Sequence, residues 1–112
     1  DKATLAIALN YGARAEMVRA TQALAARVAA GEITVEAIDE AAIDAQLYTA
    51  DLPPLDLIIR TSGEHRLSNF LLWQAAYAEM YFTDTLWPDF DGKELARALA
   101  DFAQRDRRFG GL

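Results

Sequence analysis

The sequence predicts an α/β fold, in which a parallel β-sheet is flanked by helices. Short apolar runs alternate with longer segments of helical periodicity, which is typical of parallel strands joined by crossover helices. Two runs are clear, TLAIALN at residues 4–10 and LDLIIRT at 55–61, and MYFT at 80–83 is a weaker third. Because two or three strands make a thin sheet, we expect residues 1–112 to be the C-terminal portion of a single larger domain.

The first connection is expected to be a long helix over residues 13–30. Met17, Leu24 and Val28 recur on one face at helical spacing. Gly31 follows in the usual C-terminal role of glycine. A short helical segment is expected after Thr34, and the prolines of DLPPL then make a stiff connection into the strand at residues 55–60.

Two further helices are expected in the second half. Ser68 or Asn69 can cap a helix over residues 70–79, which places Glu79 at its far end. Asp91 is expected to begin a final helix that carries Leu95, Leu99 and Phe102 on one face.

Composition and charge exclude several classes of protein. The chain has no cysteine, so disulfides and thiolate metal sites are absent. No apolar run reaches the roughly 18 residues of a membrane-spanning helix. The net charge of −6 argues against a nucleic-acid binder, because such proteins usually carry a basic face.

The stretch DLIIRTSGEHRLSNF, residues 56–70, is the strongest functional candidate. Arg60 ends a buried-looking strand, and a polar loop with Gly63, Arg66 and Ser68 follows. Ligands of open α/β sheets bind beyond the carboxyl ends of the strands, and guanidinium groups bind phosphate oxygens in a fork. The pattern therefore favours a phosphate or diphosphate site, and an ordinary surface loop with two arginines is the alternative.

A metal site is a weaker indication. A bound diphosphate is usually accompanied by Mg²⁺, which prefers carboxylate oxygens and water. His65 and Glu79 are the nearby candidates, but their spacing matches no metal motif. A plain hydrogen-bonding histidine and a solvated glutamate are the alternatives.

Three segments carry a resemblance to a known family. DLIIRTSGEHRLSNFLLWQAAYAEMYFTDTLWPDF at residues 56–90 is similar to the signature region of the cis-prenyltransferases, the undecaprenyl diphosphate synthase family. IALNYGAR at 7–14 resembles an earlier block of that family, and RRFGG at 107–111 resembles its C-terminal end. One small departure is Ala13, where the family often has a second glycine.

The resemblance implies a function for the complete enzyme. The family condenses isopentenyl diphosphate with an allylic diphosphate such as farnesyl diphosphate, forms cis double bonds, requires Mg²⁺ and works as a homodimer. The expected setting is cytoplasmic, with peripheral contact at the inner membrane face as an open alternative. The polyprenyl diphosphate is then delivered to the membrane as a lipid carrier for cell-wall peptidoglycan synthesis.

The resemblance also implies roles for individual residues. Arg60, Arg66 and Ser68 would hold isopentenyl diphosphate, with the backbone around Leu67 helping. Glu79 would be a carboxylate ligand of Mg²⁺, and His65 would lie close to the metal and the diphosphate. Arg108 and Gly110 match an ending that reaches the partner subunit's site.

One family block has no counterpart in these residues. The N-terminal block with a DGNGRW-like stretch supplies the family's catalytic aspartate, so no catalytic residue is expected within residues 1–112 and this chain alone is expected to be inactive. Two alternatives stay open. One is a non-catalytic, dimerising fragment or subunit, and the other is an unrelated α/β phosphate-binding module.

Overall fold

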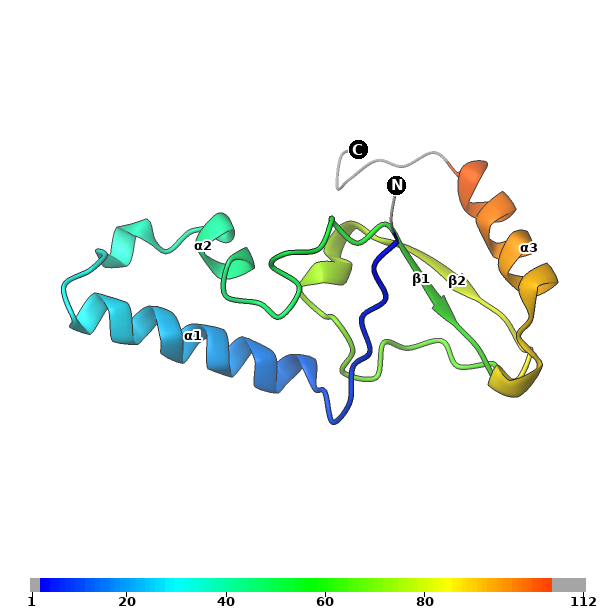
Figure 1. The fold of residues 1–112 in the computed structure, drawn as a ribbon, viewed down its shortest axis with the longest axis horizontal. Helices are drawn as coiled ribbons and strands as arrows, with labels where there is room; N and C mark the ends of the chain where they lie inside the picture. Colours follow the sequence, from blue (N-terminus) through cyan, green and yellow to red (C-terminus); the bar gives the residue numbers. More distant parts are fainter. Residues whose placement is uncertain (1–2, 106–112) are drawn as a thin grey trace. The chain divides into compact units, whose positions relative to one another are not determined.

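The computed structural model describes residues 3–105, and the chain divides into two compact units (Figure 1). The first lies within Asp1–Pro53 and the second within Pro54–Leu112. The first is helical and the second contains the sheet.

The first unit is built on helix α1, Ala13–Ala29, as its periodicity predicts. Gly12 is the extended N-cap, and Gly31 follows the helix with a φ of +76°, a left-handed conformation that glycine adopts without a Cβ clash. The buried face includes Ala20 and Leu24, which are at most 2% exposed. The 3-10 helix η1, Val35–Ala37, follows N-cap Thr34, and the short helix α2 spans Glu40–Asp44.

A buried carboxylate joins α1 to the end of the same unit. Glu16 is only 2% exposed, and its Oε2 accepts a hydrogen bond of 2.7 Å from the backbone N–H of Tyr48. The Tyr11 hydroxyl donates to the other carboxylate oxygen of Glu16. The Arg19 guanidinium lies 4.6 Å from the centre of the Tyr48 ring, an attractive cation–π arrangement.

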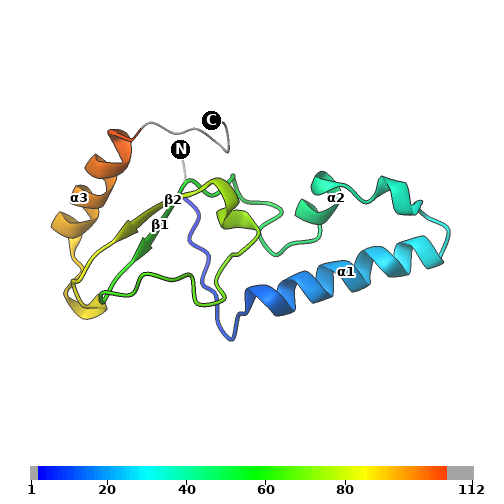
Figure 2. The same ribbon diagram turned by 180° about the vertical axis from the view of Figure 1, so that it is seen from behind.

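The second unit contains a parallel pair of strands, β1 at Leu57–Arg60 and β2 at Glu79–Phe82. Figures 1 and 2 show the two strands side by side from opposite directions. The register pairs Leu57 with Glu79 and Arg60 with Phe82. The prediction of a parallel sheet with flanking helices is therefore confirmed, and the weak strand at 80–83 is real but shifted by one residue.

Helix α3, Gly92–Ala103, closes the described part of the second unit. Its predicted start is confirmed, because the Asp91 side chain accepts a 3.0 Å hydrogen bond from the backbone N–H of Glu94. Ala98 is fully buried, whereas Leu95 and Leu99 are 42% and 49% exposed. The 3-10 helix η3, Trp87–Asp89, lies between β2 and α3.

The predicted strand at residues 4–10 is wrong in this structure. The sheet consists of β1 and β2 alone in the described part of the chain, so residues 4–10 are not hydrogen-bonded into it. Backbone N–H and C=O groups form a strand only when a neighbour takes their hydrogen bonds. Leu5, Ile7 and Leu9 are 73–86% exposed as a result.

The predicted helix at residues 70–79 is also wrong. Ser68, Asn69 and Leu71 have φ values between +50° and +63°, which is left-handed backbone that a right-handed helix cannot continue. Only the 3-10 helix η2, Gln74–Tyr77, forms there. Glu79 is therefore the first residue of β2 and not the end of a helix.

Across residues 3–105, no helix is both long and apolar enough to cross a membrane.

Candidate functional site

Arg60 lies where the sequence predicts it, at the carboxyl end of a parallel strand. It is the last residue of β1, and its carbonyl oxygen accepts a 3.0 Å hydrogen bond from the N–H of Thr83. The residue is half-buried, and its side chain has no hydrogen bond or ion pair to another residue within 3–105. A guanidinium fixed at a strand end without a carboxylate partner there is suited to bind an anion.

The strand-end loop, residues 61–66, begins with two left-handed residues. Ser62 has a φ of +65° and Gly63 a φ of +73°. A Cβ at Gly63 would lie 3.2 Å from Oδ1 of Asp84, which is tighter than ordinary van der Waals contact. The position therefore favours glycine for both its backbone conformation and its surroundings.

The loop is fastened to the threonine segment, residues 83–85, which follows β2. The N–H of Ser62 donates to the carbonyl oxygen of Thr85 at 2.8 Å, and the N–H of Gly63 donates to the carbonyl oxygen of Thr83 at 3.0 Å. These bonds hold the loop beside the end of β2, next to Arg60.

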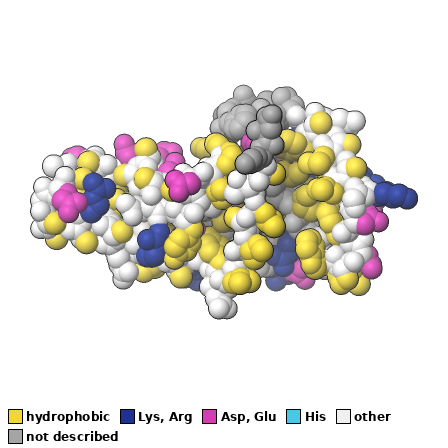
Figure 3. All heavy atoms as spheres, viewed as in Figure 1, with side chains coloured by type: hydrophobic (Ala, Val, Ile, Leu, Met, Phe, Trp, Pro, Cys, Tyr) yellow, Lys and Arg dark blue, Asp and Glu magenta, His cyan; other side chains and the backbone are white. Residues whose placement is uncertain are grey.

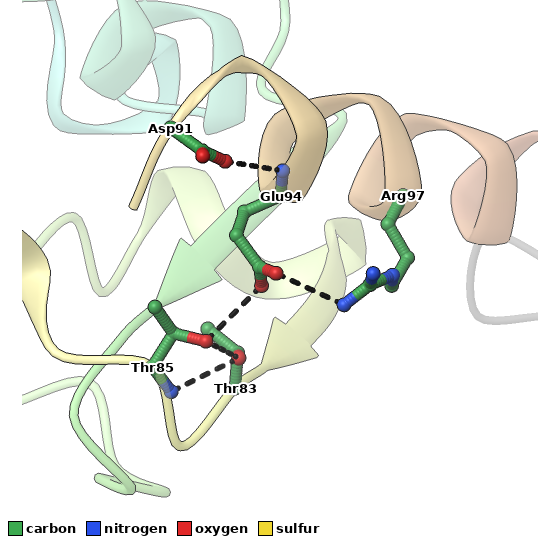
Figure 4. A network of polar contacts seen from close by, with 5 residues as sticks. All are labelled: Thr83, Thr85, Asp91, Glu94 and Arg97. Carbon is green, nitrogen blue, oxygen red and sulfur yellow. Dashed lines mark hydrogen bonds and ion pairs between the residues drawn. The ribbon is translucent and has the colours of Figure 1, made fainter. Parts of the chain in front are cut away.

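The threonine segment is in turn bonded to helix α3 (Figure 4). The Thr83 hydroxyl donates to Oγ1 of Thr85 at 3.2 Å, and the Thr85 hydroxyl donates to Oε1 of Glu94 at 3.1 Å. The other oxygen of Glu94 pairs with Nη1 of Arg97 at 2.9 Å. The side chain of Glu94 is 16% exposed, so its bond to Thr85 is partly shielded from water.

Arg66, Leu67 and Ser68 follow with less support from the fold. The Arg66 side chain is 78% exposed, and its Nε lies 3.6 Å from Oε1 of Glu64. Leu67 is half-buried, and its carbonyl oxygen accepts from the N–H of Phe70 at 3.2 Å. Ser68 is exposed with a φ of +52°. Because the predicted helix at residues 70–79 does not form, no α-helix dipole favours an anion at this point of the described chain.

His65 lies at the same strand end as Arg60. Its ring packs against Phe82, with 4.8 Å between ring centres and 39° between ring planes. Phe82 pairs with Arg60 in the sheet, so both predicted residues neighbour one side chain. The fold thus brings Arg60, His65 and the strand-end loop together.

Glu79 lies at the opposite end of β2. Three residue steps separate it from Phe82, which is about 10 Å along a strand. Successive side chains of a strand point to opposite faces, so Glu79 and Phe82 lie on different faces of the sheet. The described residues therefore do not place Glu79 beside the loop.

An arginine already engages Glu79. Nη1 of Arg105 lies 3.2 Å from Oε1 of Glu79 and donates to the carbonyl oxygen of Met80 at 2.7 Å. Hydrogen bonds to Asp101 and then to Glu79 raise the pKa of the Arg105 guanidinium, so it stays charged. Within residues 3–105, no three His, Cys, Asp or Glu side chains group to hold a metal ion. Glu79 offers one suitable oxygen ligand, and the described residues do not complete a Mg²⁺ site.

Two predicted residues lie outside the part of the chain that the structure describes. These are Arg108 and Gly110 of the C-terminal ending.

Conversely, the sequence analysis did not identify Thr85 and Glu94. Glu94 stands three residues after the Asp91 cap, where a glutamate commonly supports a helix start, but nothing local indicates that it bonds to Thr85.

The comparisons with known proteins agree on one family. The family model described as "Putative undecaprenyl diphosphate synthase" matches residues 1–110. An isoprenyl transferase of Zymomonas mobilis subsp. mobilis is 59% identical over 109 residues, covering 97% of this chain and 44% of that protein. A ditrans,polycis-undecaprenyl-diphosphate synthase ((2E,6E)-farnesyl-diphosphate specific) of Salmonella paratyphi A is 56% identical over 108 residues, covering 96% and 43%.

A solved structure agrees with these relatives. Lavandulyl diphosphate synthase from Lavandula x intermedia, in complex with dimethylallyl diphosphate, superposes with a TM-score of 0.84 at 44% identity. The match covers 89% of this chain and 43% of that one. The chain thus spans less than half the length of the relatives that it matches.

Proposed function

This chain belongs to the undecaprenyl diphosphate synthase family of prenyltransferases, and on that premise we propose that the whole protein condenses isopentenyl diphosphate with an allylic diphosphate such as farnesyl diphosphate. The product is a cis-polyprenyl diphosphate. The names of the Zymomonas and Salmonella relatives support this assignment.

The observation that carries the proposal is the arrangement at the end of β1. Arg60 is half-buried, and its guanidinium has no carboxylate partner among residues 3–105. It lies beside a loop that is bonded to the threonine segment. An anion at this position would complete a charge-assisted fork. The diphosphate of isopentenyl diphosphate is the proposed anion, with Arg66 and Ser68 as further donors.

The proposed role of this chain in the reaction is to position isopentenyl diphosphate and to supply positive charge to its diphosphate. The carbon–oxygen bond of the allylic diphosphate breaks, a carbon–carbon bond forms to the double bond of isopentenyl diphosphate, and a proton leaves the adduct. Holding the second substrate by its diphosphate sets the distance and direction of its double bond, which is a proximity effect. The proton acceptor is not assigned to any residue of this chain.

Mg²⁺ is the proposed cofactor of the whole protein, and Glu79 is its proposed ligand in this chain. The hard carboxylate oxygen suits the ion. Arg105 holds that oxygen in the structure, so the proposal requires Arg105 to release it. The remaining ligands would come from outside residues 3–105.

We also propose an assembly and a location for the whole protein. Figure 3 shows apolar side chains exposed on the visible side of the second unit, and large exposed apolar patches usually mark interfaces. Leu86 and Trp87 are 58% and 70% exposed. We assign such area to a homodimer interface, and Arg108 and Gly110 to contact with the partner's site. The proposed setting is the cytoplasmic side of the membrane that receives the lipid carrier for peptidoglycan synthesis.

A transfer assay tests the proposal. The full-length protein is incubated with radiolabelled isopentenyl diphosphate, farnesyl diphosphate and Mg²⁺, and the label is followed into solvent-extractable product. Incorporation of several isopentenyl units per farnesyl group is the expected result. If folded full-length protein leaves all label in isopentenyl diphosphate, a non-catalytic subunit becomes the better assignment.

A further inference from the structure

The strand-end loop contains backbone that is unfavourable without support from its surroundings. Ser62 is left-handed although it carries a Cβ, and left-handed backbone is unfavourable for such residues. Its N–H and that of Gly63 both donate to the threonine segment, at 2.8 and 3.0 Å. Strained backbone persists where its surroundings determine it, and such strain gathers at ligand sites.

The threonine segment owes its own position to a chain of hydrogen bonds. The backbone N–H of Thr85 donates to Oγ1 of Thr83, and the Thr83 hydroxyl donates to Oγ1 of Thr85. The Thr85 hydroxyl in turn donates to the carboxylate of Glu94. The chain ends on a charged acceptor, so each bond polarises the next. Glu94 is itself fixed in the first turn of α3 by the Asp91 cap.

We propose that Thr85 and Glu94 are positioning residues for the diphosphate-binding loop. Neither side chain is proposed to touch the substrate. Their hydrogen bond (Figure 4) fixes the threonine segment. The carbonyl groups of that segment hold Ser62 and Gly63, and thereby the loop beside Arg60. This inference rests on the proposed function and adds two residues that position its binding loop.

Arg97 provides the matched control. It pairs with the same Glu94 carboxylate, but its side chain is 68% exposed and it bonds neither threonine in the network. Arg97→Ala removes a charge from the network without breaking the Thr85–Glu94 bond. Thr85→Val removes, at nearly constant volume, the hydroxyl that donates to Glu94 and accepts from Thr83. Glu94→Ala removes only the carboxylate acceptor and keeps a good helix former. Glu94→Gln keeps an acceptor and serves as the rescue variant.

The first measurement is amide hydrogen exchange in the full-length protein. Exchange at Ser62 and Gly63 reports directly on the two bonds to the threonine segment. Thr85→Val and Glu94→Ala are expected to accelerate exchange at both amides by about tenfold, since a hydrogen bond to a charged group is lost. Arg97→Ala is expected to leave it unchanged, and Glu94→Gln is expected to recover most of the protection.

The second measurement is binding and kinetics. Titration calorimetry with inorganic diphosphate is expected to show about tenfold weaker binding in Thr85→Val and Glu94→Ala. In the transfer assay, KM for isopentenyl diphosphate is expected to rise by a similar factor. The value of kcat should stay within about twofold, and KM for farnesyl diphosphate should not change.

Two results would overturn the inference. Unchanged exchange at Ser62 and Gly63 in both variants would show that the network does not hold the loop. Faster exchange with unchanged affinity for inorganic diphosphate would show that the loop's position does not matter for binding. A wild-type protein that binds diphosphate but transfers no prenyl group would refute the proposed function alone, because exchange and calorimetry still decide this inference.

Discussion

Replacing Arg60 by alanine should remove most of the affinity for isopentenyl diphosphate. Arg60 is half-buried, and its guanidinium has no hydrogen bond or ion pair within residues 3–105, so no described polar contact is lost with it. Two charge-assisted hydrogen bonds of about 1.5 kcal/mol each, the lower end of their range, amount to about 3 kcal/mol. At 1.4 kcal/mol per tenfold, binding should weaken by about a hundredfold.

The exposure of Arg66 predicts that it contributes less to isopentenyl diphosphate binding than Arg60 does. Arg66 is 78% exposed and already lies near Glu64, and exposed charge pairs contribute at most about 1 kcal/mol. Arg66→Ala should therefore cost about fivefold or less. Arg60→Lys should fall between wild type and Arg60→Ala, because lysine keeps the charge but loses the fork.

The assay is titration of the full-length protein with isopentenyl diphosphate, with the exposed Arg97→Ala as the control for loss of one positive charge. Equal small losses in Arg60→Ala and Arg97→Ala would refute the reasoning. They would show that affinity follows net charge and not the strand-end position of Arg60.

Three further predictions use other parts of the chain. Glu79→Gln should raise the Mg²⁺ concentration for half-maximal activity by at least about tenfold. The melting temperature should stay nearly constant, because the ion pair between Glu79 and Arg105 is partly exposed. Early melting with normal Mg²⁺ dependence would make Glu79 structural. Gly63→Ala and Gly31→Ala should each destabilise the protein by about 1–2 kcal/mol in urea unfolding, because both glycines have positive φ. Only Gly63→Ala should raise KM for isopentenyl diphosphate. Equal KM values in the two variants would show that the loop is not part of the binding site. Glu16→Ala should cost about 3–5 kcal/mol of unfolding free energy, because the Tyr11 hydroxyl and the Tyr48 N–H lose their carboxylate acceptor. Glu16→Gln should be milder, and a loss below about 1 kcal/mol in Glu16→Ala would contradict a structural role for Glu16.

Local signals predicted well wherever neighbours in sequence decide the structure. Helix α1 follows from its periodicity and from Gly31, and the start of α3 follows from the Asp91 cap. The position of Arg60 at a strand end follows from an apolar run that stops at a charged residue. These features depend on residues within a turn or two of each other.

The failures have causes that lie farther away or in the backbone. Residues 4–10 carry a strand pattern, but a strand also needs a partner, which the described sheet does not supply. The apolar run after Asn69 suggests a helix, but left-handed residues such as Leu71 prevent it. The Arg105–Glu79 ion pair joins residues 26 apart in sequence, so no local pattern indicates it.

The most direct test is a crystal structure of the full-length protein with an unreactive thio-analogue of isopentenyl diphosphate. We expect diphosphate oxygens about 2.7–2.9 Å from the Arg60 guanidinium nitrogens, with the strand-end loop beside them and bonded to the threonine segment. A diphosphate bound elsewhere, with Arg60 facing solvent or paired to a carboxylate, would contradict this expectation.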